Sequence, residues 1–209
     1  GVVALEQGAV ASLDALAAQQ AANGQIPKYV DPEGHDADFW YLGCIDATLW
    51  WLIAVEHVRK HGSVGATHWA PQVALAIRWL LAQEHQHFRL LQQNEASDWA
   101  DIMPRSGYVL YTNALWAEVK RRFALAHADE TRHHFNHLFN PFQRDLPEYH
   151  RARLLRHYAR RGRRDPGLYL SFVNLSFVGD EGDVFGNVLA LLAGLADEAM
   201  AHRIVHTID

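Results

Sequence analysis

The chain has 209 residues, of which 49% are apolar and 11% aromatic, so it can bury a core and is not a low-complexity disordered segment. With 19 basic and 24 acidic residues the formal net charge is −5, which argues against a globally basic nucleic-acid binder. Glu, His or Arg interrupts the long apolar runs, so we expect neither a membrane span nor a membrane partner.

Apolar residues recur at the spacing of amphipathic helices along most of the chain. Helices are predicted, in chain order, over residues 2–22, 45–60, a segment capped by Thr67, 109–126, 147–161, 184–195 and 197–206. The stripes expected to face a core are Ile45, Leu49, Leu52, Ile53 and Glu56 in the second helix, Val73, Ile77, Leu80 and Leu81 in the third, and Val184, Val188, Leu191, Leu192 and Leu195 in the sixth.

Three connections between the predicted helices are long and rich in polar and aromatic residues. They cover residues 24–43, 92–108 and 165–183, and the middle of the last could form a short strand. We therefore predict an all-α fold of antiparallel helical hairpins with these loops on one side. Long loops in a helical domain commonly carry function.

The segment 95–105 is the best candidate for chemistry. Glu95, Asp98 and Asp101 lie close together around Trp99, and Arg105 follows. Glycoside cleavage needs such carboxylates beside an aromatic ring, because one acid must stay neutral to protonate the leaving oxygen. The indole can also stack on the apolar side of a sugar ring. In the alternative interpretation, Asp98 caps a turn and Trp99 packs in the core.

A second candidate cluster surrounds Asp46, which could also act simply as an N-cap. Trp50 and Trp51 are neighbours, and neighbouring residues on a helix point about 100° apart. Both rings therefore cannot face a core squarely, and one of them, or Tyr41 or Trp40 upstream, is expected to line a pocket. Core packing of both rings over a wide face is the alternative.

A third acidic cluster, residues 179–183, comes directly before a predicted helix. Asp183 is a natural N-cap whose charge suits the helix dipole, so we interpret the cluster as structural, with Glu181 as the exception.

Three neighbouring histidines are candidate metal ligands. His133 and His137 are four residues apart, the spacing at which two imidazoles on one helix can share an ion, and His134 lies between them. Because no third ligand is obvious, we predict no metal site and no cofactor.

Three segments together resemble bacterial amylo-α-1,6-glucosidases and related glycogen-debranching-type glycoside hydrolases. The first is NGQIPKYVDPEG followed by CIDATLWWLIAV, the second is EASDWADIMPRSGYVLYTNALW, and the third is LSFVNLSFVGDEGDVFGNVLALL. The resemblance extends over most of residues 20–195, and the second segment carries it most specifically.

The resemblance implies an (α/α)6 toroid and inverting hydrolysis of α-linked gluco-oligosaccharides or small α-glucosides. It implies Asp101 as the general acid, with Asp98 as the alternative, and a cytoplasmic protein. The residues expected to bind the carbohydrate are Asp46, Trp50, Tyr41, Trp99, Arg105, Asn113 and Glu181.

We expect residues 1–209 to be a single domain that is a fragment of such a toroid. A toroid has twelve helices and about seven are predicted here, and the chain starts Gly1-Val2-Val3 without Met. The family's general base is missing, and only Glu181 or Asp183 could replace it. A fragment would expose apolar helix faces and could self-associate through them. The alternative function is a non-catalytic carbohydrate-binding or helical assembly module.

Overall fold

The computed structural model of the protein describes residues 2–31, 33, 36–40, 43–62, 64–142, 153–154, 157–158, 160–161, 167–174 and 177–209, with the backbone alone for Val2 and Val3. These residues form two compact units. Unit 1 comprises residues 1–83 and 96–102, and unit 2 comprises 84–95 and 103–209. Both are mostly helical with a few two-residue strands, so the prediction of helical dominance is confirmed and the prediction of a purely α fold is not.

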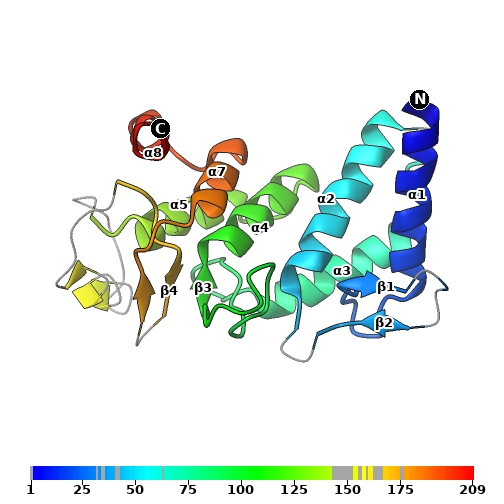
Figure 1. The fold of residues 1–209 in the computed structure, drawn as a ribbon, viewed down its shortest axis with the longest axis horizontal. Helices are drawn as coiled ribbons and strands as arrows, with labels where there is room; N and C mark the ends of the chain where they lie inside the picture. Colours follow the sequence, from blue (N-terminus) through cyan, green and yellow to red (C-terminus); the bar gives the residue numbers. More distant parts are fainter. Residues whose placement is uncertain are drawn as a thin grey trace. The chain divides into compact units, whose positions relative to one another are not determined.

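Unit 1 is built on a pair of long helices that lie side by side and run in opposite directions (Figure 1). The strands of the unit pair antiparallel, with Tyr29 opposite Asp38. Its elements are α1 (Val2–Ala18), β1 (Tyr29–Val30), β2 (Ala37–Asp38), α2 (Ile45–His61) and α3 (Ala70–Gln83).

Helix α2 matches its prediction closely. The acidic Asp46 lies in its first turn and Arg59, Lys60 and His61 lie in its last, so charged side chains complement both ends of the helix dipole. All five residues of its predicted stripe are buried.

Two predictions in unit 1 need correction. Helix α1 ends at Ala18 rather than at residue 22, because Gln19 and Gln20 donate three residues back, in a tighter turn that leads out of the helix. In α3, Leu80 of the predicted stripe is buried but Leu81 is 47% exposed. The buried Ala76 shows that the inward face is rotated slightly from the predicted one.

Unit 2 contains a three-stranded antiparallel sheet in the order β3-β4-β5. Its elements are β3 (Tyr108–Val109), α4 (Leu110–Arg122), α5 (Ala128–Phe139), β4 (Phe172–Val173), β5 (Val178–Gly179), α7 (Val184–Leu192) and α8 (Glu198–Ile208). The short strand anticipated in residues 165–183 is therefore confirmed, as part of a hairpin. The helix predicted over 147–161 falls largely outside the described residues.

The buried face of α7 differs from the predicted stripe. Leu192 is 76% exposed and Val184 is 49% exposed, whereas Leu189 is buried. The polar Asn187 decides the orientation, because its side chain accepts from the backbone N–H of Tyr169 at 2.9 Å and donates to the Tyr169 carbonyl at 3.3 Å. The amide can make these bonds only when its face of α7 points inward.

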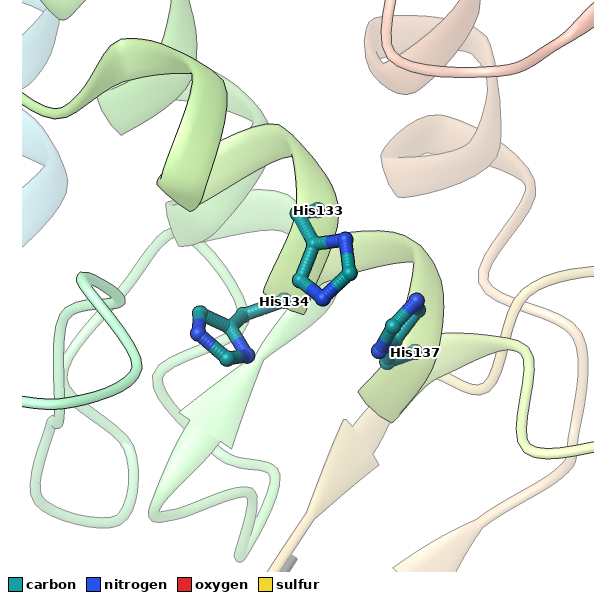
Figure 2. A group of neighbouring side chains, drawn as sticks. All are labelled: His133, His134 and His137. Atoms are coloured by element: carbon teal, nitrogen blue, oxygen red, sulfur yellow. The ribbon is translucent and has the colours of Figure 1, made fainter. Parts of the chain in front are cut away.

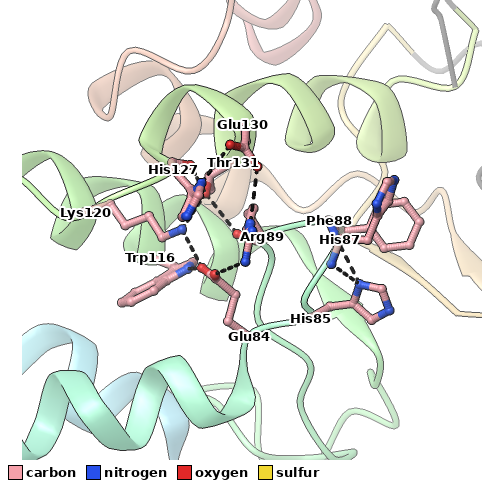
Figure 3. Close-up of polar contacts among 10 residues, drawn as sticks. All are labelled: Glu84, His85, His87, Phe88, Arg89, Trp116, Lys120, His127, Glu130 and Thr131. Carbon is pink, nitrogen blue, oxygen red and sulfur yellow. Dashed lines mark hydrogen bonds and ion pairs between the residues drawn. The ribbon is translucent and has the colours of Figure 1, made fainter. Parts of the chain in front are cut away.

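A buried polar network joins α4, α5 and the chain after α3 within unit 2 (Figure 3). The ammonium of Lys120 pairs with the Glu84 carboxylate and donates to Thr131 Oγ1 at 2.8 Å. The Trp116 indole N–H donates to Glu84 Oε2 at 2.8 Å. Burial lowers the pKa of Lys120, and the hydrogen bond to Glu84 opposes that change.

Candidate functional site

A cavity of about 410 Å³ lies within unit 1, at the start of α2. It combines two carboxylates with several tryptophans and an apolar floor, which is a composition typical of small-ligand pockets. The residues that line it are Leu13, Leu16, Pro27, Lys28, Trp40, Gly43, Cys44, Asp46, Ala47, Trp50, Trp51, Ala54, Asp98 and Trp99.

Hydrogen bonds to backbone carbonyls hold the segment 96–99 against Trp40 and the start of α2. The Ile45 N–H donates to the Ser97 carbonyl at 3.0 Å, and the Trp40 indole N–H donates to the Ala96 carbonyl at 3.1 Å. These bonds bring the two sequence clusters around Asp46 and Asp98 to one cavity.

The two carboxylates of the cavity are both buried. Asp98 is 4% exposed and its Oδ1 accepts from the Ala100 N–H at 2.9 Å, so the predicted turn-capping role is present. Asp46 lies in the first turn of α2, but the N-cap position belongs to Cys44. The alternative interpretation, in which Asp46 is the N-cap of this helix, is therefore wrong.

The tryptophans divide between core and surface as their spacing predicts. Trp51 is 2% exposed and donates to the Leu13 carbonyl at 3.2 Å, whereas Trp50 is 40% exposed. Trp99 is 53% exposed, so the alternative that it packs in the core is wrong. Two partly exposed indoles therefore border the cavity.

Asp101 is not among the lining residues, and an ion pair engages its carboxylate. Lys28 Nζ lies 2.6 Å from Asp101 Oδ2, and the same ammonium lies 4.7 Å from the centre of a Trp40 ring. The hydrogen bond to Asp101 raises the pKa of Lys28. Lys28 itself lines the cavity, so the ion pair of Lys28 and Asp101 lies at its edge.

Cys44 is the single cysteine of the chain and is buried beside the cavity. Its thiol donates to the Phe39 carbonyl at 3.5 Å and accepts from the Gln25 side-chain amide at 3.7 Å. Burial raises the pKa of the Cys44 thiol to about 11. The thiol is therefore protonated at neutral pH and unsuited to nucleophilic chemistry.

Three further predicted carbohydrate-binding residues, Arg105, Asn113 and Glu181, belong to unit 2. Each makes hydrogen bonds within that unit. The Arg105 guanidinium lies 2.8 Å from Asp183 Oδ2, and Ser171 Oγ donates to Glu181 Oε1 at 2.5 Å.

The Asn113 side chain is fully buried and bonds to three backbone groups. Its oxygen accepts from Leu91 N–H at 2.7 Å, and its nitrogen donates to the carbonyls of Leu91 at 3.1 Å and Val109 at 2.9 Å. It therefore fixes a loop against α4. Tyr41, the remaining predicted binding residue, lies outside the described residues.

Three histidines of α5 lie next to one another in unit 2 (Figure 2). One ring nitrogen from each of His133, His134 and His137 lies within 4.8 Å of the others. Burial, followed by the positive charges that His133 and His87 can carry, lowers the pKa of His134 to about 4. The sequence singles out the pair His133 and His137, whereas the nearness of the His134 ring does not follow from spacing, because spacing does not reveal which way that ring turns.

Neither the protein-family models nor the curated proteins compared with this chain match it. In the described part of the chain, every helix is too short or too polar to cross a bilayer.

Proposed function

We propose that the cavity of unit 1 binds a sugar residue of an α-linked gluco-oligosaccharide. In this proposal the chain is part of a cytoplasmic, debranching-type glycoside hydrolase with an (α/α)6 toroid. One observation carries it: Asp46 and Trp50 from one segment of the resemblance and Asp98 and Trp99 from another line a single cavity.

The chemistry of the cavity suits a sugar better than a purely apolar ligand. Its volume of about 410 Å³ falls in the range of about 300–1,000 Å³ that small-molecule pockets occupy. Partly exposed indoles such as Trp50 and Trp99 offer flat apolar faces for the C–H side of a pyranose ring. The carboxylates of Asp46 and Asp98 can accept hydrogen bonds from its hydroxyl groups.

For the general acid, the geometry favours Asp98 over Asp101. Asp98 lines the cavity, whereas Lys28 engages the Asp101 carboxylate at 2.6 Å. An inverting enzyme also needs a base about 6.5–9.5 Å from the acid, with a water molecule between them. The two candidates named from the sequence, Glu181 and Asp183, belong to unit 2 and are each bonded there, Glu181 to Ser171 and Asp183 to Arg105. The proposal therefore assigns no base to Asp98.

Binding can be tested without turnover. We expect maltotriose or isomaltose to change the tryptophan fluorescence of the chain and to give a saturable heat in titration calorimetry. Trp99→Ala should weaken binding by about fivefold, equivalent to about 1 kcal/mol of lost ring contact. Phe177→Ala is the control, since Phe177 is a 68% exposed ring in unit 2 and should leave binding unchanged.

Absence of any response at millimolar sugar, or equal weakening by both substitutions, would overturn the proposed binding site. Equal weakening would mean that exposed aromatic rings bind the sugar unspecifically.

Turnover is a separate measurement of released glucose from isomaltose and maltooligosaccharides. If hydrolysis is observed, Asp98→Asn should abolish it, whereas Asp101→Asn should reduce it less. Hydrolysis that survives both substitutions would refute the assignment of the acid. Sugar binding with no hydrolysis by the full chain would favour the alternative, a non-catalytic carbohydrate-binding module.

The second candidate, a helical assembly module, has its own supporting observation. Leu192, Phe185 and Val184 of α7 are large apolar residues that are all at least 43% exposed. Sedimentation-equilibrium measurements should then detect self-association that Leu192→Glu abolishes. A chain that stays monomeric at every concentration would rule this candidate out.

A further inference from the structure

The strongest feature that the carbohydrate proposal leaves unused is the histidine cluster on α5. His133 and His137 are one helical turn apart, with ring centres separated by 3.8 Å, and His134 lies 5.0 Å from His133 by the same measure (Figure 2). The cluster lies entirely within unit 2.

We propose that His133, His134 and His137 form a binding site for a divalent transition metal, with Zn²⁺ as the best-fitting ion. Zinc binds imidazole nitrogen at about 2.0–2.1 Å, which separates two tetrahedral ligands by about 3.3 Å. The ligand atoms of the cluster lie within 4.8 Å of one another. Ring rotations that shorten these separations by up to about 1.5 Å would complete the contacts.

The ligand type of the cluster restricts the class of metal. Imidazole binds a metal ion through a neutral ring nitrogen. Imidazole ligands favour zinc, copper, nickel and cobalt over magnesium or calcium, which prefer oxygen. The ligand set therefore selects the class of ion.

The neighbouring groups leave room for a fourth ligand. His133 and His137 line a cavity of about 290 Å³ whose wall also contains Asp129 and Asp197. These carboxylates contribute negative potential that favours a cation, and Arg132 in the same wall opposes them. Three histidines with a water molecule in the fourth position is a known arrangement for zinc.

The chain contains its own controls, because two other histidine pairs have the same spacing. His57 and His61 lie on α2 with ring centres 4.8 Å apart, and His202 and His206 lie on α8. Neither pair belongs to a cluster of three metal-ligating residues among the described residues. Binding that requires three ligands should therefore not depend on them.

The test is a titration of the full, metal-stripped chain with ZnCl₂ at pH 7.5, read by calorimetry and by thermal unfolding. We expect one Zn²⁺ per chain and a melting temperature that rises with the zinc concentration. His133→Ala and His134→Ala should each weaken binding at least about tenfold. The paired control variants His57→Ala/His61→Ala and His202→Ala/His206→Ala should bind as the unchanged chain does.

Cobalt gives a second readout that does not depend on stability. Co²⁺ in a four-coordinate histidine site has intense visible absorption, and His134→Ala should reduce that absorption. Because His137 is buried and its replacement can disturb α5, the exposed His133 and the half-buried His134 are the primary variants, and circular dichroism in EDTA verifies their folding.

The proposal is overturned if the chain binds no Zn²⁺ at 100 μM, or if the α2 or α8 pair variants lose binding and the folded α5 variants keep it. These outcomes are independent of sugar binding in unit 1.

Discussion

Replacement of Lys120 by Met removes one charge from a buried ion pair and keeps a side chain of similar length. The Lys120 side chain is fully buried, its ammonium pairs with Glu84, and it donates to Thr131 Oγ1 (Figure 3). Without Lys120 the Glu84 carboxylate remains in surroundings of low polarity with its main counter-charge removed. This remaining charge is the larger part of the cost of breaking a buried pair.

Two neighbours of Glu84 reduce the loss of folding free energy expected for Lys120→Met. The Trp116 N–H still donates to Glu84 Oε2 at 2.8 Å, and an Arg89 nitrogen lies 3.8 Å from Glu84 Oε1. Removal of one partner from a buried pair costs about 3–5 kcal/mol, and these contacts lead us to expect about 3 kcal/mol for Lys120→Met. The double variant Lys120→Met/Glu84→Gln removes both charges and keeps an acceptor for Trp116, so it should cost only about 1 kcal/mol.

Urea unfolding at pH 7, followed by circular dichroism, measures the free energies of unfolding of Lys120→Met, Glu84→Gln, the double variant and the unchanged chain. A double variant more stable than Lys120→Met alone would establish the coupling between the two charges. The reasoning fails if Lys120→Met lies within about 1 kcal/mol of the unchanged chain, or if the effects of the two substitutions simply add.

Three further predictions concern other sites. Acidification from pH 6.5 to pH 4 should destabilise the fold through His134. The pKa of this ring is about 4 in the folded chain and about 6.5 in the unfolded chain, so in this range the unfolded chain binds a proton that the folded chain does not. The corresponding free energy is at most about 3 kcal/mol, which solvent screening reduces to about 1 kcal/mol. In urea unfolding with EDTA present, His134→Gln should therefore lose about 1 kcal/mol less stability than the unchanged chain between pH 6.5 and pH 4. Gly24→Ala should lower the free energy of unfolding by about 2–4 kcal/mol in thermal unfolding, because Gly24 has a φ of +104° and the new Cβ would lie 2.2 Å from the Leu75 carbonyl oxygen. Asp183→Ala should lower the free energy of unfolding, measured in urea, by at least about 3 kcal/mol, because it removes both the N-cap of α7 and the buried partner of Arg105. Asp183→Asn should lower it less, because the side-chain oxygen of Asn can still cap the helix.

Each of these predictions has a contradicting result. Equal pH dependence of His134→Gln and the unchanged chain would remove His134 as the source of acid sensitivity. An unchanged melting temperature for Gly24→Ala would mean that the Leu75 carbonyl moves away at no cost. Equal stability of Asp183→Ala and Asp183→Asn would show that the cap contributes nothing.

Helical periodicity predicts the buried stripe of α2 but not that of α7. All five predicted residues of α2 are buried, although Asp46, Thr48 and Trp51 outside the stripe are buried as well. In α7, apolar residues surround the helix, and two hydrogen bonds between Asn187 and Tyr169 decide which side is buried. A pairing of that kind across the fold has no local signature in the sequence.

The sequence likewise predicts some residues of the candidate sugar site and not others. The adjacency of Trp50 and Trp51 suffices to predict that one ring reaches the surface, and Trp50 does. Lys28 gives no such signal, because it is a single lysine in a loop and its partner Asp101 is 73 residues away. The helix over 128–139 was not predicted because His133 and its neighbouring histidines obscure the apolar stripe that contains Phe135 and Leu138.

The burial of Cys44 has a practical consequence for experiments on this chain. A thiol with a pKa of about 11 that is 3% exposed contains almost no thiolate at neutral pH and reacts slowly with maleimides or iodoacetamide. A cysteine introduced at an exposed position such as Ile102 would then be labelled selectively, with the native residue left in place. Dye or spin-label probes at exposed positions of unit 1 therefore need no cysteine-free background.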